Sequence, residues 1–264
     1  MGWAMTIILK PFSVGELCDG CSWEVEDVEV LAEQIARVAV GQAEHVAEIL
    51  AYAGLAEMVT TNEAVEDAVE LLTVNGEEDP FHRDGWMFQV MSWLAAHQST
   101  PGGLIRTPHM ILAHKGFDGI QIALDSDSKV VTAVIIFEDK ATKNPRSTVR
   151  EDVWPEFRSI EAGKKQNVLV AEVTSMLKAV PDLDTSSAVQ KIIWANAKCY
   201  RLSITIENAH ATEKGRERLF AGYDEVAPGD RSRRLGETFL IPSLREWMAT
   251  LAELAIDKAR TLRI

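Results

Sequence analysis

Asp118, Glu138 and Lys140 are the residues whose types and spacing best suit a chemical function. Glu138 and Lys140 end the segment VVTAVIIFEDK, which begins at Val130 and is otherwise almost entirely apolar. Because side chains alternate along a strand, these two share one face and the side chain of Asp139 takes the other. Asp118 precedes the segment GIQIAL and is separated from Glu138 by 19 residues. In an antiparallel hairpin the start of the first strand lies beside the end of the second, so we expect Asp118 beside Glu138.

Two carboxylates with an ammonium beside them suit the metal-assisted hydrolysis of a phosphodiester. Carboxylate oxygens are hard ligands, which Mg²⁺ and Mn²⁺ prefer, and these ions keep positions for water and phosphate oxygens. The metal would polarise the phosphoryl group, and Lys140 would position or deprotonate the attacking water and offset charge in the transition state. Without a metal, Asp118 and Glu138 would repel each other, and one would tend to take up a proton. We therefore expect strong metal dependence.

The elements that position these residues follow a mixed α/β pattern after Gly103. Stretches of strand length, rich in β-branched residues, alternate with stretches of helical periodicity. The predicted strands cover 119–124, 130–137, 167–173, 201–206 and 237–241, and the predicted helices cover 147–162, 186–199, 211–226 and 243–260. This order predicts an α/β fold with a mixed sheet flanked by helices. The strand at 130–137 lacks polar alternation, which predicts a central strand covered on both faces.

The first hundred residues have a helical pattern. An apolar stripe between residues 31 and 49 predicts one helix, and a capping box formed by Thr60 and Glu63 predicts the start of a second. A third helix begins near Asp84 in a segment rich in large apolar residues. We expect this third helix to be buried on much of its surface.

Charge divides the chain unevenly. Residues 1–100 contain 18 acidic and three basic residues, a net charge of −15, whereas residues 101–264 carry +2 and the whole chain −13. We predict an acidic, mainly helical N-terminal extension over 1–80 and a second domain over 81–264. The acidic part either is a solvated surface, or repels nucleic acid or docks a basic partner while the C-terminal part presents a basic groove.

Cysteine use and hydropathy bear on the compartment. Cys18, Cys21 and Cys199 are too few, and odd in number, for a disulfide framework, which favours a reducing cytoplasm. No stretch approaches the about 20 apolar residues of a membrane span, so we expect no membrane partner. Cys18 and Cys21 have the spacing of half a zinc site or a redox pair, but the sequence contains no second CxxC motif.

The segments GFDG at 116–119 and EDK at 138–140 resemble the active-site motif of the PD-(D/E)xK nuclease superfamily. Most of residues 80–264, including RDGWMFQVMSWLAAHQ, IIFEDKAT, VWPEF and RRLGETFLIPSLREWM, looks like the HamA family, the nuclease subunits of the Hachiman anti-phage defence system. The resemblance implies a restriction-endonuclease-like core with an αβββαβ order. It also implies a DNase with little sequence specificity, held in a heteromeric complex by a helicase subunit, HamB.

The same resemblance implies roles for individual residues. Asp118 and Glu138 would be ligands of Mg²⁺ or Mn²⁺, and the main-chain carbonyl of Asp139 would add a third ligand. Lys140 would be the catalytic lysine. Phe117 stands where the superfamily has a proline, which is the least chemical member of the motif.

Several other residues are second-tier candidates for the site. Asp84 and Gln89 could supply the acid or amide that many superfamily members carry on the first helix. Gln190 begins a pattern like the Gln-x-x-x-Tyr element of some relatives, with Trp in place of Tyr. His109 and His114 flank the strand that Asp118 precedes, where either would contact a phosphate, assist proton transfer or serve only as scaffold.

Lys143, Arg146 and Arg150 follow the predicted catalytic strand and are predicted to contact backbone phosphates of DNA without reading sequence. Two other functions fit the same sequence. One is a non-catalytic DNA-binding or partner-docking subunit of a defence or repair complex. The other is a metal-dependent hydrolase acting on RNA or on a nucleotide.

Overall fold

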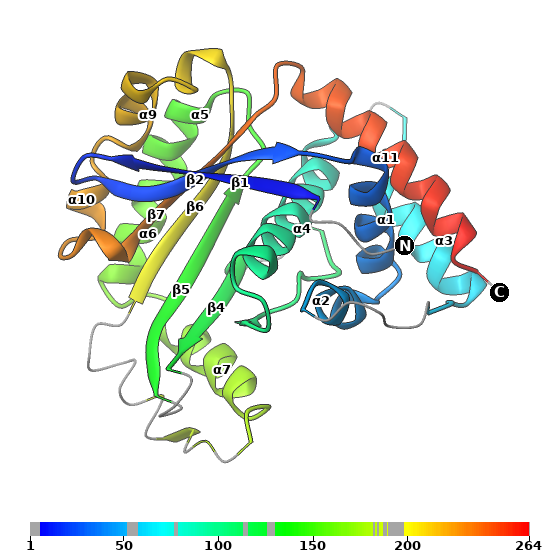
Figure 1. The fold of residues 1–264 in the computed structure, drawn as a ribbon, viewed down its shortest axis with the longest axis horizontal. Helices are drawn as coiled ribbons and strands as arrows, with labels where there is room; N and C mark the ends of the chain where they lie inside the picture. The colour runs from blue at the N-terminus through cyan, green and yellow to red at the C-terminus, as the bar shows by residue number, and fades with distance from the viewer. Residues whose placement is uncertain are drawn as a thin grey trace.

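The structure of the protein is a computed structural model that describes residues 6–51, 58–76, 79–112, 116–125, 130–181, 183, 185–186, 189 and 198–263. A seven-stranded mixed sheet runs through the molecule, with the strands in the order β1-β2-β7-β6-β5-β4-β3. Helices lie on both faces of this sheet (Figure 1). The predicted mixed α/β fold with flanking helices is therefore confirmed.

The sheet has a parallel centre and antiparallel edges. Its strands are β1 (Ile7–Val14), β2 (Cys18–Val25), β3 (Leu104–Ile105), β4 (Gly119–Leu124), β5 (Val131–Lys140), β6 (Lys198–Ile206) and β7 (Arg234–Leu240). Strands β5, β6, β7 and β2 run parallel to one another. At one edge β4 and β3 are antiparallel, and at the other edge β1 is antiparallel to β2.

Two hydrophobic cores cover the two faces. The helices of the first core are α1 (Val28–Ala39), α2 (Ala43–Ala51), α3 (Asn62–Leu72), α4 (Phe81–Ser99) and α11 (Leu244–Thr261). The second core lies under the π-helical turn Val149–Val153, which follows α5 (Pro145–Thr148), and under α6 (Trp154–Glu161), α7 (Gln166–Leu177), α9 (Glu213–Phe220) and α10 (Tyr223–Val226). Phe137 on β5 belongs to the first core and Ile136 to the second. Strand β5 is therefore buried on both faces, as predicted.

Most of the elements predicted after Gly103 are present, with one error of type. Residues 167–173 were predicted to be a strand because of their valines, but they lie in α7. The buried side chains of this helix are Leu169, Val173 and Leu177, which recur every four residues. That spacing puts them on one helical face, and packing of this face outweighs the β preference of valine. The helix predicted at 186–199 falls mainly outside the described residues, and β6 begins at Lys198.

The helical pattern predicted for the first hundred residues does not hold at their start, where two strands lie. Strands β1 and β2 form a hairpin, and β2 pairs with β7 from the opposite end of the chain. A Cβ atom on Gly20 would lie 1.6 Å from the carbonyl oxygen of Gly236, so this close pairing requires glycine. The sheet thus crosses the predicted boundary between 1–80 and 81–264, and the N-terminal part is not a helical extension alone.

The helices of the N-terminal part lie close to their predicted positions. The apolar stripe over 31–49 is divided between α1 and α2 by Gly41, whose φ is 84°. Helix α3 is capped by Thr61, whose side chain accepts a hydrogen bond from the backbone of Ala64, and not by Thr60. Among the described helices, none is long and apolar enough to cross a membrane.

Candidate active site

The three residues predicted to act together lie together at the carboxyl end of β5. Gly119 of β4 pairs with Phe137 of β5, so the preceding Asp118 reaches the level of Glu138. The Lys140 Nζ atom lies 2.6 Å from Glu138 Oε1 and 3.9 Å from Asp118 Oδ2. One ammonium group is therefore shared between two carboxylates.

Asp118 is oriented by hydrogen bonds to both of its carboxylate oxygens. The Gln89 Nε2 atom on α4 donates to Asp118 Oδ1 over 2.7 Å. The backbone N–H of Asp139 donates to Asp118 Oδ2 over 2.8 Å. Of the two candidates on α4, Gln89 thus contacts the cluster directly.

The side chain of Asp139 points away from the cluster, as predicted. It is buried on the α4 side of the sheet, where Ser92 Oγ donates to its Oδ1 over 2.6 Å. Ser92 Oγ also lies 3.2 Å from Ser203 Oγ on β6. Gln89 and Ser92 are three residues apart on α4, so one face of this helix holds both Asp118 and Asp139. That the carbonyl of Asp139 binds a metal stays a prediction.

The carboxylates of the cluster are held in an environment that disfavours their charge. Burial raises the pKa of Asp118 to about 6, against the opposing charge of Lys140. Burial and then the Asp118 carboxylate raise the pKa of Glu138 to about 7. Burial lowers the pKa of Lys140, but Glu138 and Asp118 outweigh it and hold that pKa above its usual range. Within the cluster, two half-buried carboxylates face one ammonium, so the cluster itself is short of positive charge.

The donor set fits a hard divalent cation. The two carboxylates share one ammonium and have raised pKa values, and a bound Mg²⁺ or Mn²⁺ would relieve their uncompensated charge. Within the described part of the chain, no group of three or more His, Cys, Asp or Glu residues is arranged to hold a metal. Asp118 and Glu138 would therefore be the side-chain ligands, and water, substrate or main-chain oxygens would supply the others, which is usual for Mg²⁺.

A pocket of about 330 Å³ opens beside Asp118 and Lys140, and Glu138 is not among the residues that line it. Its wall includes Phe81, His82, Gly85, Trp86, Gln89, Ile111, Leu112, Asp118, Asp139, Lys140, Ala141, Thr142, Thr148 and Asp152. Phe81 and Ile111 are large apolar side chains, yet they are 55% and 71% exposed. The pocket thus combines an acidic interior with apolar groups that face solvent. The position of Phe81 and Ile111 in the pocket wall was not predicted, because the sequence does not show whether a single apolar side chain is buried or exposed.

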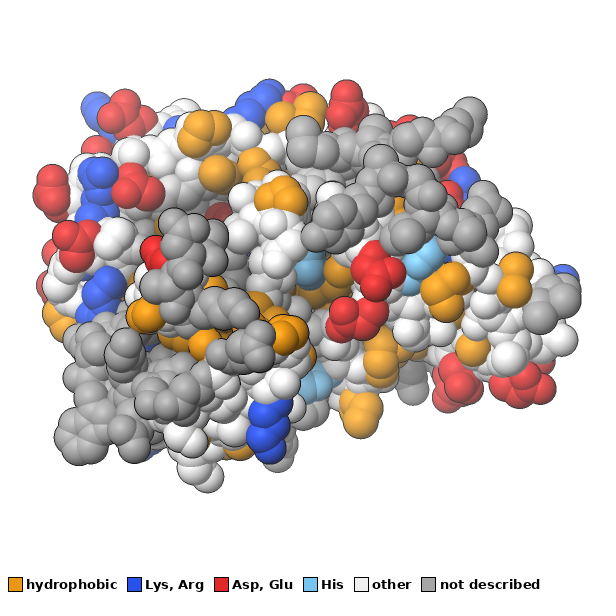
Figure 2. Space-filling model, turned by 60° about the horizontal axis from the view of Figure 1, so that its bottom comes forward, with side chains coloured by type: hydrophobic (Ala, Val, Ile, Leu, Met, Phe, Trp, Pro, Cys, Tyr) orange, Lys and Arg blue, Asp and Glu red, His pale blue; other side chains and the backbone are white. Residues whose placement is uncertain are grey.

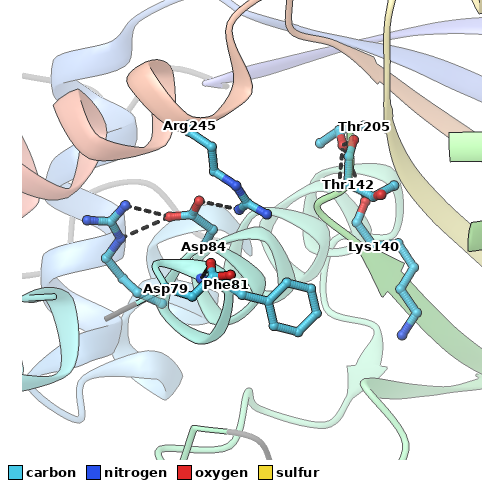
Figure 3. A network of polar contacts seen from close by, with 8 residues as sticks. Asp79, Phe81, Asp84, Lys140, Thr142, Thr205 and Arg245 are labelled. Carbon is cyan, nitrogen blue, oxygen red and sulfur yellow. Dashed lines mark hydrogen bonds and ion pairs between the residues drawn. The ribbon is translucent and has the colours of Figure 1, made fainter. Parts of the chain in front are cut away.

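Asp84, the other candidate on α4, belongs to a different cluster. It is fully buried, and Arg83 donates to its Oδ1 from Nε over 2.9 Å and from Nη2 over 2.6 Å. Arg245 of α11 donates to Asp84 Oδ2 (Figure 3). This cluster joins α4 to α11, and Asp84 is not among the residues that line the pocket. The structure therefore does not bring Asp84 to Asp118 and Glu138.

The cations predicted to contact DNA differ in their surroundings. Lys143 is exposed. Arg146 is half-buried, and its Nη1 donates to the carbonyl oxygens of Leu219 and Ala221 over 3.0 and 3.2 Å. Arg150 is exposed and forms an ion pair of 2.7 Å with its neighbour Glu151. Arg146 therefore has a packing role that its position in the sequence did not reveal.

Of the remaining candidates, two lie outside the described residues and the others are not placed in this site. His114 and Gln190 lie outside the described residues. The carbonyl oxygen of His109 accepts a hydrogen bond of 2.6 Å from the Trp86 indole. Cys18 and Cys21 are both free thiols, and their odd separation along β2 points them to opposite faces. They therefore form neither a redox pair nor half of a zinc site.

No protein-family model, no curated protein and no solved structure matches this chain.

Proposed function

We propose that the protein is a metal-dependent nuclease that hydrolyses phosphodiester bonds in DNA. The observation that carries this proposal is the pair of half-buried carboxylates, Asp118 and Glu138, that share the ammonium of Lys140 beside a pocket lined by Asp118 and Lys140. Buried like charges are costly, and a fold keeps them where they bind something of opposite charge.

The roles of the residues follow from their contacts. A bound Mg²⁺ or Mn²⁺ would supply Lewis-acid activation of a phosphoryl group and of water. Asp118, oriented by Gln89 and by the Asp139 N–H, would hold the ion together with Glu138. Lys140 keeps its proton at neutral pH because its pKa is raised. It would therefore position water and offset charge on the phosphate rather than act as a base.

The order of elements supports membership in the PD-(D/E)xK superfamily. Helix α4, strands β3, β4 and β5, helices α5 to α7 and strand β6 follow one another as in an αβββαβ core. We propose on this basis a restriction-endonuclease-like core and a role like that of the HamA family. In that role the protein would act in the cytoplasm, in anti-phage defence, with a helicase subunit like HamB.

Cleavage of plasmid DNA tests the site directly. Purified protein, alone and with a candidate helicase partner, would be incubated with plasmid in Mg²⁺ and in EDTA. We expect cleavage in Mg²⁺ alone, and its loss in Glu138→Ala and in Lys140→Ala. Glu151→Ala removes an exposed carboxylate outside the pocket and is the matched control. Cleavage that survives the first two substitutions would show that the chemistry lies elsewhere.

The acidic face of α3 favours one alternative, a subunit that docks a partner without catalysis. Glu63, Glu66 and Glu70 are exposed, and no ion pair within the described residues neutralises them. Reversing their charge should weaken binding of a basic partner and spare cleavage by the isolated protein. DNA binding without cleavage under any of these conditions would favour this alternative.

A further inference from the structure

We infer that the pocket over Asp118 and Lys140 admits a single strand of DNA, one nucleotide at a time, with a base stacked on Phe81. This inference rests on the proposed nuclease function and names the substrate of the same site. Three observations support it: the depth of the Asp118 carboxylate, the exposed apolar side chains that line the pocket, and the nearby arginines that already bind other protein groups.

The Asp118 carboxylate lies below the surface. Its side chain is 17% exposed, and the pocket that it lines together with Lys140 measures about 330 Å³. That volume is near the lower limit of pockets that bind small molecules, about 300 Å³, and suits a ligand of the size of one nucleotide. The stiff backbone of an intact duplex would hold its phosphates above such a pocket, whereas a flexible single strand could bend to bring a phosphate to its floor.

The rim offers an aromatic surface where a base would lie. Phe81 begins α4, lines the pocket and exposes more than half of its side chain. The Phe81 ring and the Lys140 side chain extend to the same side of α4 (Figure 3). Ile111 on the loop after β3 also lines the pocket and is largely exposed. A base stacked on an aromatic side chain of a single-strand site contributes about 1–3 kcal/mol, whatever its sequence.

The arginines near the pocket are poorly suited to cradle a duplex. Arg106 pairs with Glu172 at 3.2 Å, Arg146 donates to two carbonyl oxygens, and Arg245 is bound to Asp84. Figure 2 turns the lower edge of Figure 1 forward, and on the face that it shows the basic side chains of the described residues lie among acidic and apolar ones. Duplex binding depends mainly on many phosphate contacts, so stacking must supply much of the affinity here.

Binding and cleavage of matched oligonucleotides test this inference. A fluorescent single strand and the same strand annealed to its complement would be titrated with the full chain in Ca²⁺, and then cleaved in Mg²⁺. We expect tighter binding and faster cleavage of the single strand. Phe81→Ala should raise the Kd for the single strand by about 5- to 150-fold and leave the duplex Kd within twofold. Phe81→Trp should restore single-strand binding.

A second exposed apolar residue provides the matched control. Leu240 is 40% exposed at the end of β7 and does not line this pocket, so Leu240→Ala should leave both Kd values unchanged. Equal binding of single strand and duplex, or an unchanged Kd in Phe81→Ala, would overturn the inference. If cleavage were nevertheless lost in Lys140→Ala, the proposed nuclease function would stand without the single-strand preference. Binding that depends on Phe81, without any cleavage by the native protein, would instead uphold the pocket and refute the nuclease.

Discussion

Two carboxylate clusters lie near α4, and they differ in how their charge is balanced. Asp84 is fully buried and is held by two guanidinium groups, those of Arg83 and Arg245. Asp118 and Glu138 are two half-buried carboxylates that share one ammonium, and Asp118 opens onto a pocket. The first cluster has more positive than negative charge, and the second has the reverse.

This difference separates a structural from a binding role. Where guanidinium groups saturate a buried carboxylate, no charge is left for a ligand, and the ion pairs join two helices. Where buried carboxylates outnumber their cations, the site gains free energy by taking up protons or a metal. The two clusters therefore predict opposite responses to the loss of a carboxylate.

The largest expected effect is on the saturated cluster. Asp84→Ala leaves Arg83 nearly buried with no carboxylate, and Arg245 loses its partner. Removing one member of a buried ion pair costs about 3–5 kcal/mol, and we expect the lower value because Arg245 is a quarter exposed. Urea unfolding would measure the loss of stability. Unchanged stability together with lost cleavage would instead place Asp84 in the active site.

In the unbalanced cluster the loss of a carboxylate should stabilise the fold. The pKa of Glu138 is about 7 in the folded protein, against 4.5 for a glutamate side chain in water. The folded state therefore binds the proton more tightly, so stability falls as pH rises from about 4.5 to 7, and the whole cost is present above 7. At pH 8, Glu138→Gln should raise the free energy of unfolding by on the order of 2–3 kcal/mol.

Two controls test whether the gain in stability of Glu138→Gln comes from the removed charge: its dependence on pH and its dependence on Mg²⁺. At pH 4, Glu138 is protonated in both states, so Glu138→Gln should have almost no effect. At pH 8, added Mg²⁺ should stabilise the native protein and not the variant, because ligand binding to the folded state raises stability. A variant that is less stable than the native protein at pH 8 would contradict the idea of a cluster short of positive charge.

The contrast between these clusters shows which parts of a site can be predicted from the sequence. The meeting of Asp118 and Glu138 was predictable because a hairpin fixes which residues lie opposite one another. The separate fates of Asp84 and Gln89 were not, because they depend on Arg245, which is 161 residues from Asp84 in sequence. Local patterns carry no information on such distant partners.

The same limit applies to the fold. The strands that alternate with helices after Gly103 were predicted from local apolar patterns, and most are present. The hairpin of β1 and β2 was missed because Pro11 and Gly20 interrupt its pattern, while its pairing with β7 depends on Gly236 at the other end of the chain. Helix α7 was taken for a strand because the packing of its buried face is set by the second core.

A smaller effect is expected behind the site, at Ser92. Its hydroxyl donates to Asp139, whose pKa burial raises to about 6, so at pH 8 the acceptor is charged. Loss of a hydrogen bond to a charged group costs about 1.5–3 kcal/mol, and loss of one to a neutral group costs less. Ser92→Ala should therefore destabilise the protein by about 2 kcal/mol at pH 8 and by less at pH 5. Ser99→Ala, at the exposed end of α4, is the control and should cost less at both pH values.

The smallest effect concerns Lys143 and Arg146, the two cations after β5. Arg146 is bound by other protein groups, whereas Lys143 is exposed to solvent. Lys143 is exposed, so Lys143→Ala should reduce the salt dependence of single-strand binding, by about 0.7 in the slope of log K against log salt. Arg146 is held by two carbonyl oxygens, so Arg146→Ala should lower stability by about 1 kcal/mol and leave that slope unchanged. Titrations over a range of salt concentrations, paired with urea unfolding, measure both quantities. If Arg146→Ala changed the slope as much as Lys143→Ala, its guanidinium would be a DNA contact despite its packing, and charge saturation would no longer separate structural from binding groups in this protein.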